Sequence, residues 1–151
     1  MKINDYIARI KKLNACGEAL KDALNYETSQ ELWADCKRGD RMLWLIGKLI
    51  SESGCCKRKH LTLTACKCAR LALQYVEKGK NDVSLDHARA AVAHAFAAAY
   101  AVYDYAHAFA TAEAVYEYAY AYADADTKNR ISIKCADIIR AEHPDVDSIL
   151  G

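Results

Sequence analysis

The sequence predicts an all-α protein: a single-domain bundle of about seven helices with a long helical hairpin rich in alanine and tyrosine. Three observations predict it. The 151 residues contain one proline and six glycines, so few positions interrupt a helix. Hydrophobic residues make up 53% of the chain and charged residues 27%, which is typical of a domain with a sizeable core. Apolar residues also recur at helical spacing along most of the chain.

The first half of the chain, residues 1–80, predicts five helices. Thr28 and Glu31 form a capping-box pattern at the start of the third, and Asp40 is expected to cap the fourth. The segment CCKRKH is expected to be a loop, with Thr62 beginning the next helix. That fifth helix is apolar on two sides, which indicates a position inside the core. The five helices are expected at 4–13, 15–24, 28–37, 41–53 and 62–77.

The second half continues with helices from Ser84, a good N-cap residue, to residue 142. The alanine-rich tract from residue 84 is either one helix of nearly forty residues or two helices with a break near Thr111. We favour the break, because ordinary helices are shorter than forty residues. A last helix is expected at 128–142, before an acidic tail at 144–151.

Tyrosine stands at every second position of the stretch VYEYAYAYADAD, residues 115–126. A period of two is the pattern of a strand, but alanine is a strong helix former and no second segment offers a strand partner. In a helix, Val115, Tyr118 and Tyr122 form one stripe and Tyr116 and Tyr120 form a second pair. We therefore predict a helix, packed with the rest of the hairpin against residues 40–77.

Charge is unevenly distributed within this single domain. Residues 1–80 carry 16 Lys and Arg against 9 Asp and Glu, which makes this half basic. Residues 81–151 carry 5 against 11, so the Ala/Tyr-rich half (81–143) and the tail are acidic. Such a dipolar molecule can steer a charged partner.

Residues 88–125 are long enough to span a bilayer, but they include Arg89, Asp104 and Glu113, which are costly in lipid. The polar start of the chain does not look like a signal peptide. We therefore expect a cytoplasmic protein that does not contact a membrane.

Five potential zinc ligands fall within 14 residues: Cys55, Cys56, His60, Cys66 and Cys68. Their C-C and C-x-C spacings do not match the C-x2–4-C pairs of common zinc sites. We expect reduced thiols packed in the core, and neither a metal nor a cofactor.

The five histidines occur in no nucleophile or metalloenzyme motif, and no glycine-rich phosphate loop is present. We therefore expect a protein without catalytic residues.

Two sets of residues are candidates for binding a partner. One is basic, because lysine and arginine cluster at 57–59 and again at 37–41, where they can meet phosphates or an acidic protein. The other combines tyrosines that lie off the main apolar stripes with nearby acids, since tyrosine is enriched at interfaces. The tyrosines equally suit packing in the core or a homodimer contact. The partner-binding candidates are Tyr100, Tyr105, Tyr116, Tyr120, Glu113, Glu117, Lys57, Arg58 and Lys59, with Lys37, Arg38 and Arg41 as the second basic group.

Several stretches resemble the immunity-protein-five-like family, the immunity proteins of bacteria and their phages. They are QELWADCKRGDRMLWLIGKL (30–49), TACKCARLALQYV (64–76), the alanine-rich tract and KCADIIRAEHP (134–144), in the family's order. The resemblance implies a non-enzymatic protein that binds and blocks a toxin, or a phage protein that neutralises a host defence effector. It carries no agreed set of functional residues.

Two other functions are open from the residues themselves. A sponge for an anionic signalling nucleotide would need an internal pocket lined by tyrosine and arginine. A nucleic-acid binder would use the basic half, and its binding would weaken steeply with salt.

Overall fold

Nine helices make up the part of the chain that the computed structural model describes, which is residues 1–50, 54–76, 82–100 and 105–150. They form one all-α domain, and within these residues the only β pairing is an isolated bridge between Lys2 and Thr28. The helices are α1 (Ile3–Lys12), α2 (Gly17–Ala23), α3 (Ser29–Asp35), α4 (Gly39–Ile50), α5 (Cys55–Leu73), α6 (Asp82–Tyr100), α7 (Tyr105–Ala121), α8 (Ala125–Glu142) and α9 (Val146–Leu150).

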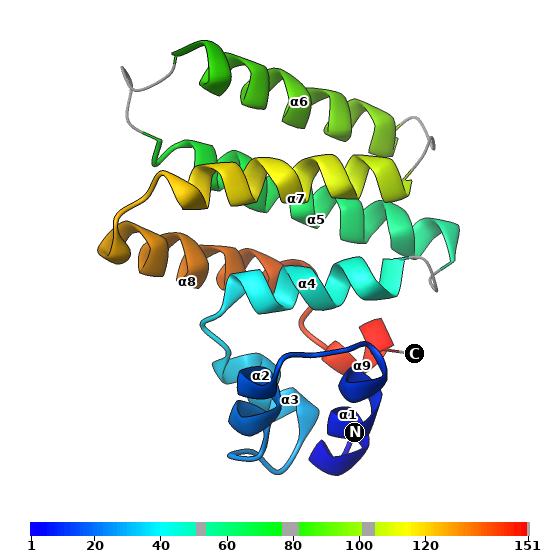
Figure 1. Cartoon of the computed structure of the whole chain (residues 1–151). Coiled ribbons are helices and arrows are strands. Elements are labelled where there is room, and N and C mark those ends of the chain that lie inside the picture. Colours follow the sequence, from blue (N-terminus) through cyan, green and yellow to red (C-terminus); the bar gives the residue numbers. More distant parts are fainter. Residues whose placement is uncertain (51–53, 77–81, 101–104, 151) are drawn as a thin grey trace.

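Helix α5 is the centre of the bundle and packs against α4, α6, α7 and α8. In Figure 1, α6, α7 and α5 form the upper part of the molecule, α4 and α8 cross beneath them, and α1, α2, α3 and α9 lie at the bottom. Both predicted apolar sides of α5 are buried: Cys66 and Ala69 on one side, Cys68 and Ala72 on the other. The prediction of a core helix in this region is confirmed.

The alternating tyrosines lie on a helix, as predicted, since α7 runs from Tyr105 to Ala121. Helices α6 and α7 run in opposite directions beside each other, and both pack on α5 (Figure 1). The tract forms two helices, as favoured from the sequence, but the predicted position of the break is wrong, because Thr111 lies inside α7. Its hydroxyl donates to the carbonyl of His107 at 3.0 Å, one turn earlier. The chain leaves α6 at Tyr100 instead.

The predicted loop at residues 55–60 is also wrong, because α5 already begins at Cys55. Gly54 takes the N-cap position, and its carbonyl accepts the first helical hydrogen bond from the Arg58 amide at 2.9 Å. Thr62 is therefore not a helix start. It is buried about two turns into α5, and its hydroxyl donates to the Tyr105 carbonyl at 3.4 Å.

Gly39 begins α4, where it touches α8. A Cβ atom on Gly39 would lie 2.5 Å from the carbonyl oxygen of Ser132 and 2.7 Å from the Cβ of Cys135. The Gly39 amide also donates to the Ser132 hydroxyl at 3.1 Å. Asp40 is inside the helix, so the prediction that it is the N-cap is wrong. Its carboxylate accepts instead from Nε and Nη2 of Arg38, at 3.0 and 2.8 Å.

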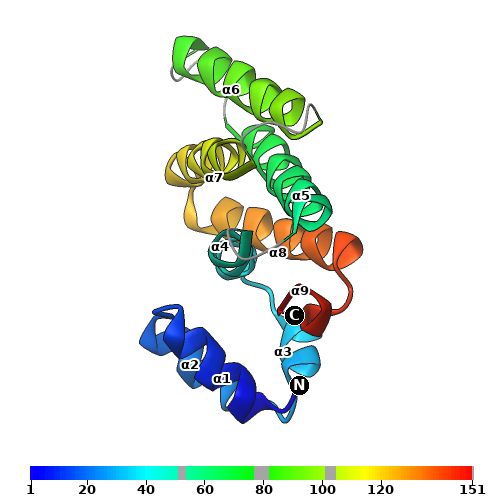
Figure 2. The ribbon, with the colours of Figure 1, turned by 90° about the vertical axis from the view of Figure 1, so that its right-hand side faces the viewer.

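The predicted tail contains a short helix, α9, which packs against α3 and α4. Val146, Ile149 and Leu150 are all buried, at i, i+3 and i+4 spacing. The N-terminal amine forms an ion pair with Asp147 in the same helix, so the two ends of the chain lie close together (Figure 2). The C-terminal residues therefore complete the core rather than trail from it.

Caps at the other helix starts follow the expected chemistry. Thr28 and Glu31 make the predicted capping box at α3. Helix α8 begins three residues earlier than expected, because Asp124 accepts a hydrogen bond from the Thr127 amide at 2.7 Å. Helix α2 begins at Gly17 rather than at residue 15.

Candidate functional site

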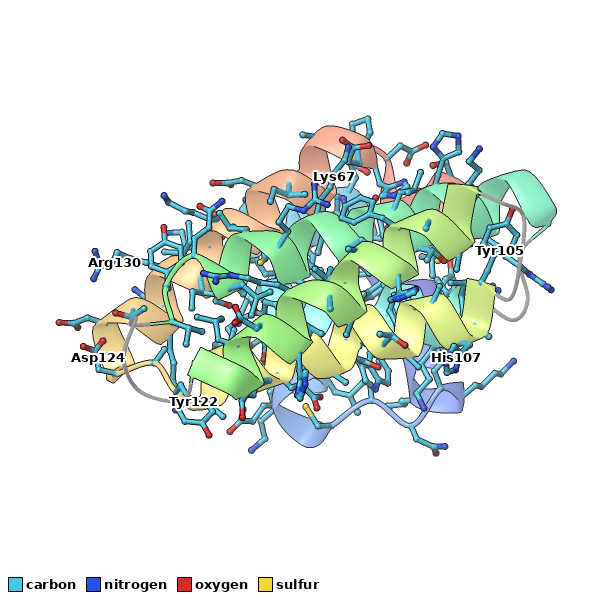
Figure 3. The ribbon with its side chains drawn as sticks, turned by 90° about the horizontal axis from the view of Figure 1, so that it is seen from above. Lys67, Tyr105, His107, Tyr122, Asp124 and Arg130 are labelled. Carbon is cyan, nitrogen blue, oxygen red and sulfur yellow. The ribbon has the colours of Figure 1, made fainter. Side chains whose placement is uncertain are left out.

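The predicted tyrosines do not form one surface. Tyr105 lies at one end of α7 and Tyr122 at the other (Figure 3). Tyr105 and Tyr116 are buried, with 7% and 3% of their surface exposed, so the expectation that they offer a docking surface fails on burial. Tyr120 is half-buried and remains accessible, and the side chain of Tyr100 lies outside the described residues.

Tyrosine rings pack in two pairs on α7. Tyr116 and Tyr120 stack with their ring centroids 5.9 Å apart, and Tyr118 and Tyr122 meet at 4.9 Å with tilted rings. The Lys128 ammonium lies 5.5 Å from the Tyr120 centroid. Tyr116 is buried and Tyr118 is half-buried, so in each pair the inner ring supports the outer one, and Tyr122 is 53% exposed.

The two predicted acids belong to a surface that α4 and α7 share. Glu113 is half-buried and Glu117, one turn later, is exposed. Burial, and then repulsion from Glu117, raises the pKa of Glu113, while Lys48 of α4 opposes the change. Lys48 in turn lies 5.9 Å from the ring centroid of Trp44, one turn earlier on α4.

We call this surface the α4/α7 face, and define it by Trp44, Lys48, Glu113, Glu117 and Tyr120. It joins two aromatic rings to three charges on two packed helices. The α7 residues of this face were predicted from the sequence, but Trp44 and Lys48 were not. The sequence around these two residues of α4 does not indicate that they lie beside α7.

The two helices approach each other closely beneath this face. A Cβ atom on Gly47 would lie 2.7 Å from the ring of Phe109, so only glycine fits here without a shift. The close contact fixes the spacing of the side chains above it.

The predicted basic group at 57–59 lies on the first turns of α5, beside α9. The Lys57 ammonium donates to the Ser148 carbonyl near the end of α9. Lys57, Arg58 and Lys59 are all half-buried, so part of each side chain covers its neighbours. This group therefore helps to hold α9, and none of its residues lines the pocket described next.

A pocket of about 300 Å³ lies between α1–α3 and α4. Its walls include apolar side chains of α1, α3 and α4 and polar side chains from the ends of these helices. The second predicted basic group, Lys37, Arg38 and Arg41, lines one side of it. The aromatic residues that line it are Tyr6, Tyr26, Trp33 and Trp44. No local sequence pattern could have predicted this pocket, because the residues that line it are spread along the chain from 6 to 45.

The cysteines of the sequence cluster lie in the core where they are described. Cys66 and Cys68 are buried, and burial raises the pKa of Cys66 to about 11. Cys68 contacts Cys135 of α8, with each thiol 3.7–3.8 Å from the other residue's carbonyl oxygen, and this hydrogen bonding raises the pKa of Cys68. The side chains of Cys55 and Cys56 lie outside the described residues. Among the described ones, no three His, Cys, Asp or Glu side chains are grouped as metal ligands.

None of the described helices is both long and apolar enough to cross a membrane. Comparisons with protein-family models, with curated proteins and with solved structures found no match for the chain.

Proposed function

We propose that the protein is a non-enzymatic immunity or counter-defence protein, which neutralises a toxin or a defence effector by binding it stoichiometrically. The observation that carries the proposal is the α4/α7 face. The resemblance of residues 30–49, 64–76 and 134–144 to immunity proteins supplies the biological direction, and it stays an expectation.

The chemistry of the face suits a protein partner. Tryptophan and tyrosine dominate binding energy at protein interfaces, because they bury a large rigid area and keep a polar tip. Trp44 and Tyr120 are both half-buried, so each ring is held by its neighbours and still exposes a surface. Ordering these side chains on binding therefore costs less entropy than ordering free ones.

The charges on the face favour a partner with a basic patch. Glu113 and Glu117 lie one turn apart, and burial, followed by repulsion from Glu117, raises the pKa of Glu113. A cation from a partner would relieve that repulsion. Lys48, at the edge of the face, can then pair with an acidic side chain of the partner, which fixes the orientation of the partner on the face.

The size of the protein is sufficient for this mode of action. The chain exposes 8289 Å², and an interface of ordinary size covers about 800 Å² of each partner. One face of the bundle can thus provide the whole contact, and steric blocking needs no reactive group.

The test begins with capture of the partner on the full-length protein, followed by calorimetry and an activity assay on the purified pair. We expect one-to-one binding that abolishes the partner's activity. Glu117→Lys should weaken binding about 10- to 30-fold, the effect of losing a residue worth about 1.4–2 kcal/mol. The substitution places opposite charges one turn apart on α7, so it should not harm folding.

Glu27→Lys is the matched control, because it makes the same change of charge at an exposed site outside the face. It should leave the dissociation constant within about twofold of wild type. Equal weakening by both variants, or a bound partner that keeps its full activity, would contradict the proposal.

A further inference from the structure

The pocket between α1–α3 and α4 is built from fixed side chains. The Trp33 indole N–H donates to the His143 carbonyl at 2.8 Å, and the Tyr26 hydroxyl donates to Asp35 at 2.7 Å. Arg41 of α4 forms ion pairs with Glu18 and Asp22, which tie α2 to α4 across the site. The α1–α3 group lies below α4 in Figure 1, and these contacts hold the two together.

Aromatic rings provide the apolar part of the pocket. Tyr6 and Trp33 are almost fully buried, with 8% and 3% of their surface exposed, and Met42 packs beside them. Tyr26 and Trp44 are half-buried at its edge. Flat aromatic ligands stack on rings that expose part of a face in this way.

The charged residues in the lining distinguish an anionic ligand from a cationic one. Asp22 pairs with Arg41, whereas Asp35 accepts a hydrogen bond from Tyr26 and keeps its charge. The lining sets these two carboxylates against three cations, Lys37, Arg38 and Arg41, and this balance favours an anion. Lys37 makes no hydrogen bond or ion pair with any described residue. Arg38 holds Asp40 with Nε and Nη2, which leaves Nη1 for a ligand.

We propose that this pocket binds a small aromatic anion, whose ring packs against Tyr26 and Trp44 at the edge of the pocket while its phosphate or carboxylate meets Lys37 and Arg38. The volume of about 300 Å³ is at the lower end of the range for small-molecule pockets. It suits a ligand of the size of a nucleoside monophosphate or an indole carboxylate. The pocket shares Trp44 with the α4/α7 face, and its other lining residues lie outside that face.

The two tryptophans of the chain both line the pocket, so tryptophan emission reports on this site when no protein partner is present. We would titrate the full-length protein with the four common nucleoside 5′-monophosphates and, separately, with indole-3-acetate. Calorimetry gives the dissociation constants in both arms, and tryptophan emission locates the binding in the nucleotide arm, because indole-3-acetate itself fluoresces as tryptophan does. At least one of these two arms should show one-to-one binding, and the active arm identifies the source of the anion.

Matched ligands and variants test each part of the site. Removing the anionic group, as in adenosine or indole, should weaken binding about tenfold, and so should Lys37→Glu, since a charged hydrogen bond contributes about 1.5–3 kcal/mol. Lys21→Glu makes the same charge change on exposed α2, outside the lining, and should leave binding unchanged. Neither lysine is part of the core, so both variants should fold.

Three results would overturn the assignment. They are the absence of binding in both arms at millimolar concentration, equal affinity for the neutral analogue and the anion, and equal weakening by the Lys37 and Lys21 variants. The last two would mean that the anion or the position of the charge has no role.

Discussion

Gly39→Ala is the substitution for which the structure makes the sharpest expectation. The new methyl group would lie 2.5 Å from the Ser132 carbonyl oxygen, 2.7 Å from the Cys135 Cβ and 2.9 Å from the Ala136 amide nitrogen. Two of these atoms are backbone atoms of α8, so no side-chain rotation relieves the contact. Helix α4 must move away from α8.

The size of the effect follows from these distances. A carbon–oxygen contact needs about 3.3 Å, so α4 must shift by roughly 0.8 Å. Overpacking of this kind costs about 1–3 kcal/mol. The shift also lengthens the hydrogen bond from the Gly39 amide to the Ser132 hydroxyl, now 3.1 Å, at a further cost of about 1 kcal/mol. We therefore expect a loss of about 2–4 kcal/mol in the free energy of unfolding.

Urea denaturation followed by circular dichroism measures this loss, and thermal unfolding should show Tm lower by about 5–15 °C. Gly17→Ala is the matched control, since a Cβ atom there meets nothing within 4 Å. It should be neutral, or stabilise by about 0.5 kcal/mol through a less flexible unfolded chain. If Gly39→Ala lies within about 0.5 kcal/mol of this control, the close packing of α4 on α8 is not real.

Four further expectations concern single side chains. Ile149→Ala, in a residue 3% exposed on α9, should cost about 2–5 kcal/mol of unfolding free energy in urea, and a loss below about 1 kcal/mol would mean that α9 does not complete the core. Tyr116→Phe removes a buried hydroxyl that has no hydrogen-bond partner among the described residues, so stability should stay equal or rise; a clear loss in the same assay would reveal a hidden partner. Burial lowers the pKa of His143, so the unfolded chain binds a proton at this residue more readily than the folded chain does. The stability that the neutral imidazole contributes is therefore present above about pH 6.5 and is lost as pH falls through the lowered pKa. His143→Gln should flatten this dependence of unfolding free energy on pH in urea titrations, and an unchanged pH dependence would contradict the expectation. Thr28→Ala should cost about 1 kcal/mol in thermal unfolding and Thr28→Ser should restore most of it, unless the capping box is absent in solution.

The sequence was sufficient for the helical class and for most helices, because periodicity and composition agree along the chain. It also decided the tyrosine stretch correctly, since alanine between the rings favours a helix over a strand. It did not reveal which tyrosines are buried. Helix α7 is apolar on most sides, so its pattern cannot say where α4, α5 and α6 cover it. Tyr116 was a candidate for binding a partner, with core packing left equally open, and it lies in the core.

Helix boundaries failed where local charge and tertiary contact disagree. The segment CCKRKH was expected to be a loop, although three cations at a helix start only oppose the positive end of its dipole and do not prevent a helix. In the structure, Lys57 bonds the Ser148 carbonyl, at the end of α9 where the dipole is negative. Gly39 was expected to lie between the helices at 28–37 and 41–53, because the approach of Ser132 from 93 residues away leaves no trace in the local sequence.

The two basic groups show how geometry separates clusters that look alike in sequence. Both contain three cations within five residues. The group at 57–59 is half-buried beside α9, so a ligand there would compete with the packing of the C-terminus. The group at 37–41 has structural partners for Arg38 and Arg41 but none for Lys37 among the described residues, and all three border an aromatic pocket. An anion that binds Lys37 displaces none of these contacts. The density of charge in the sequence could not have distinguished the group at 37–41 from the group at 57–59.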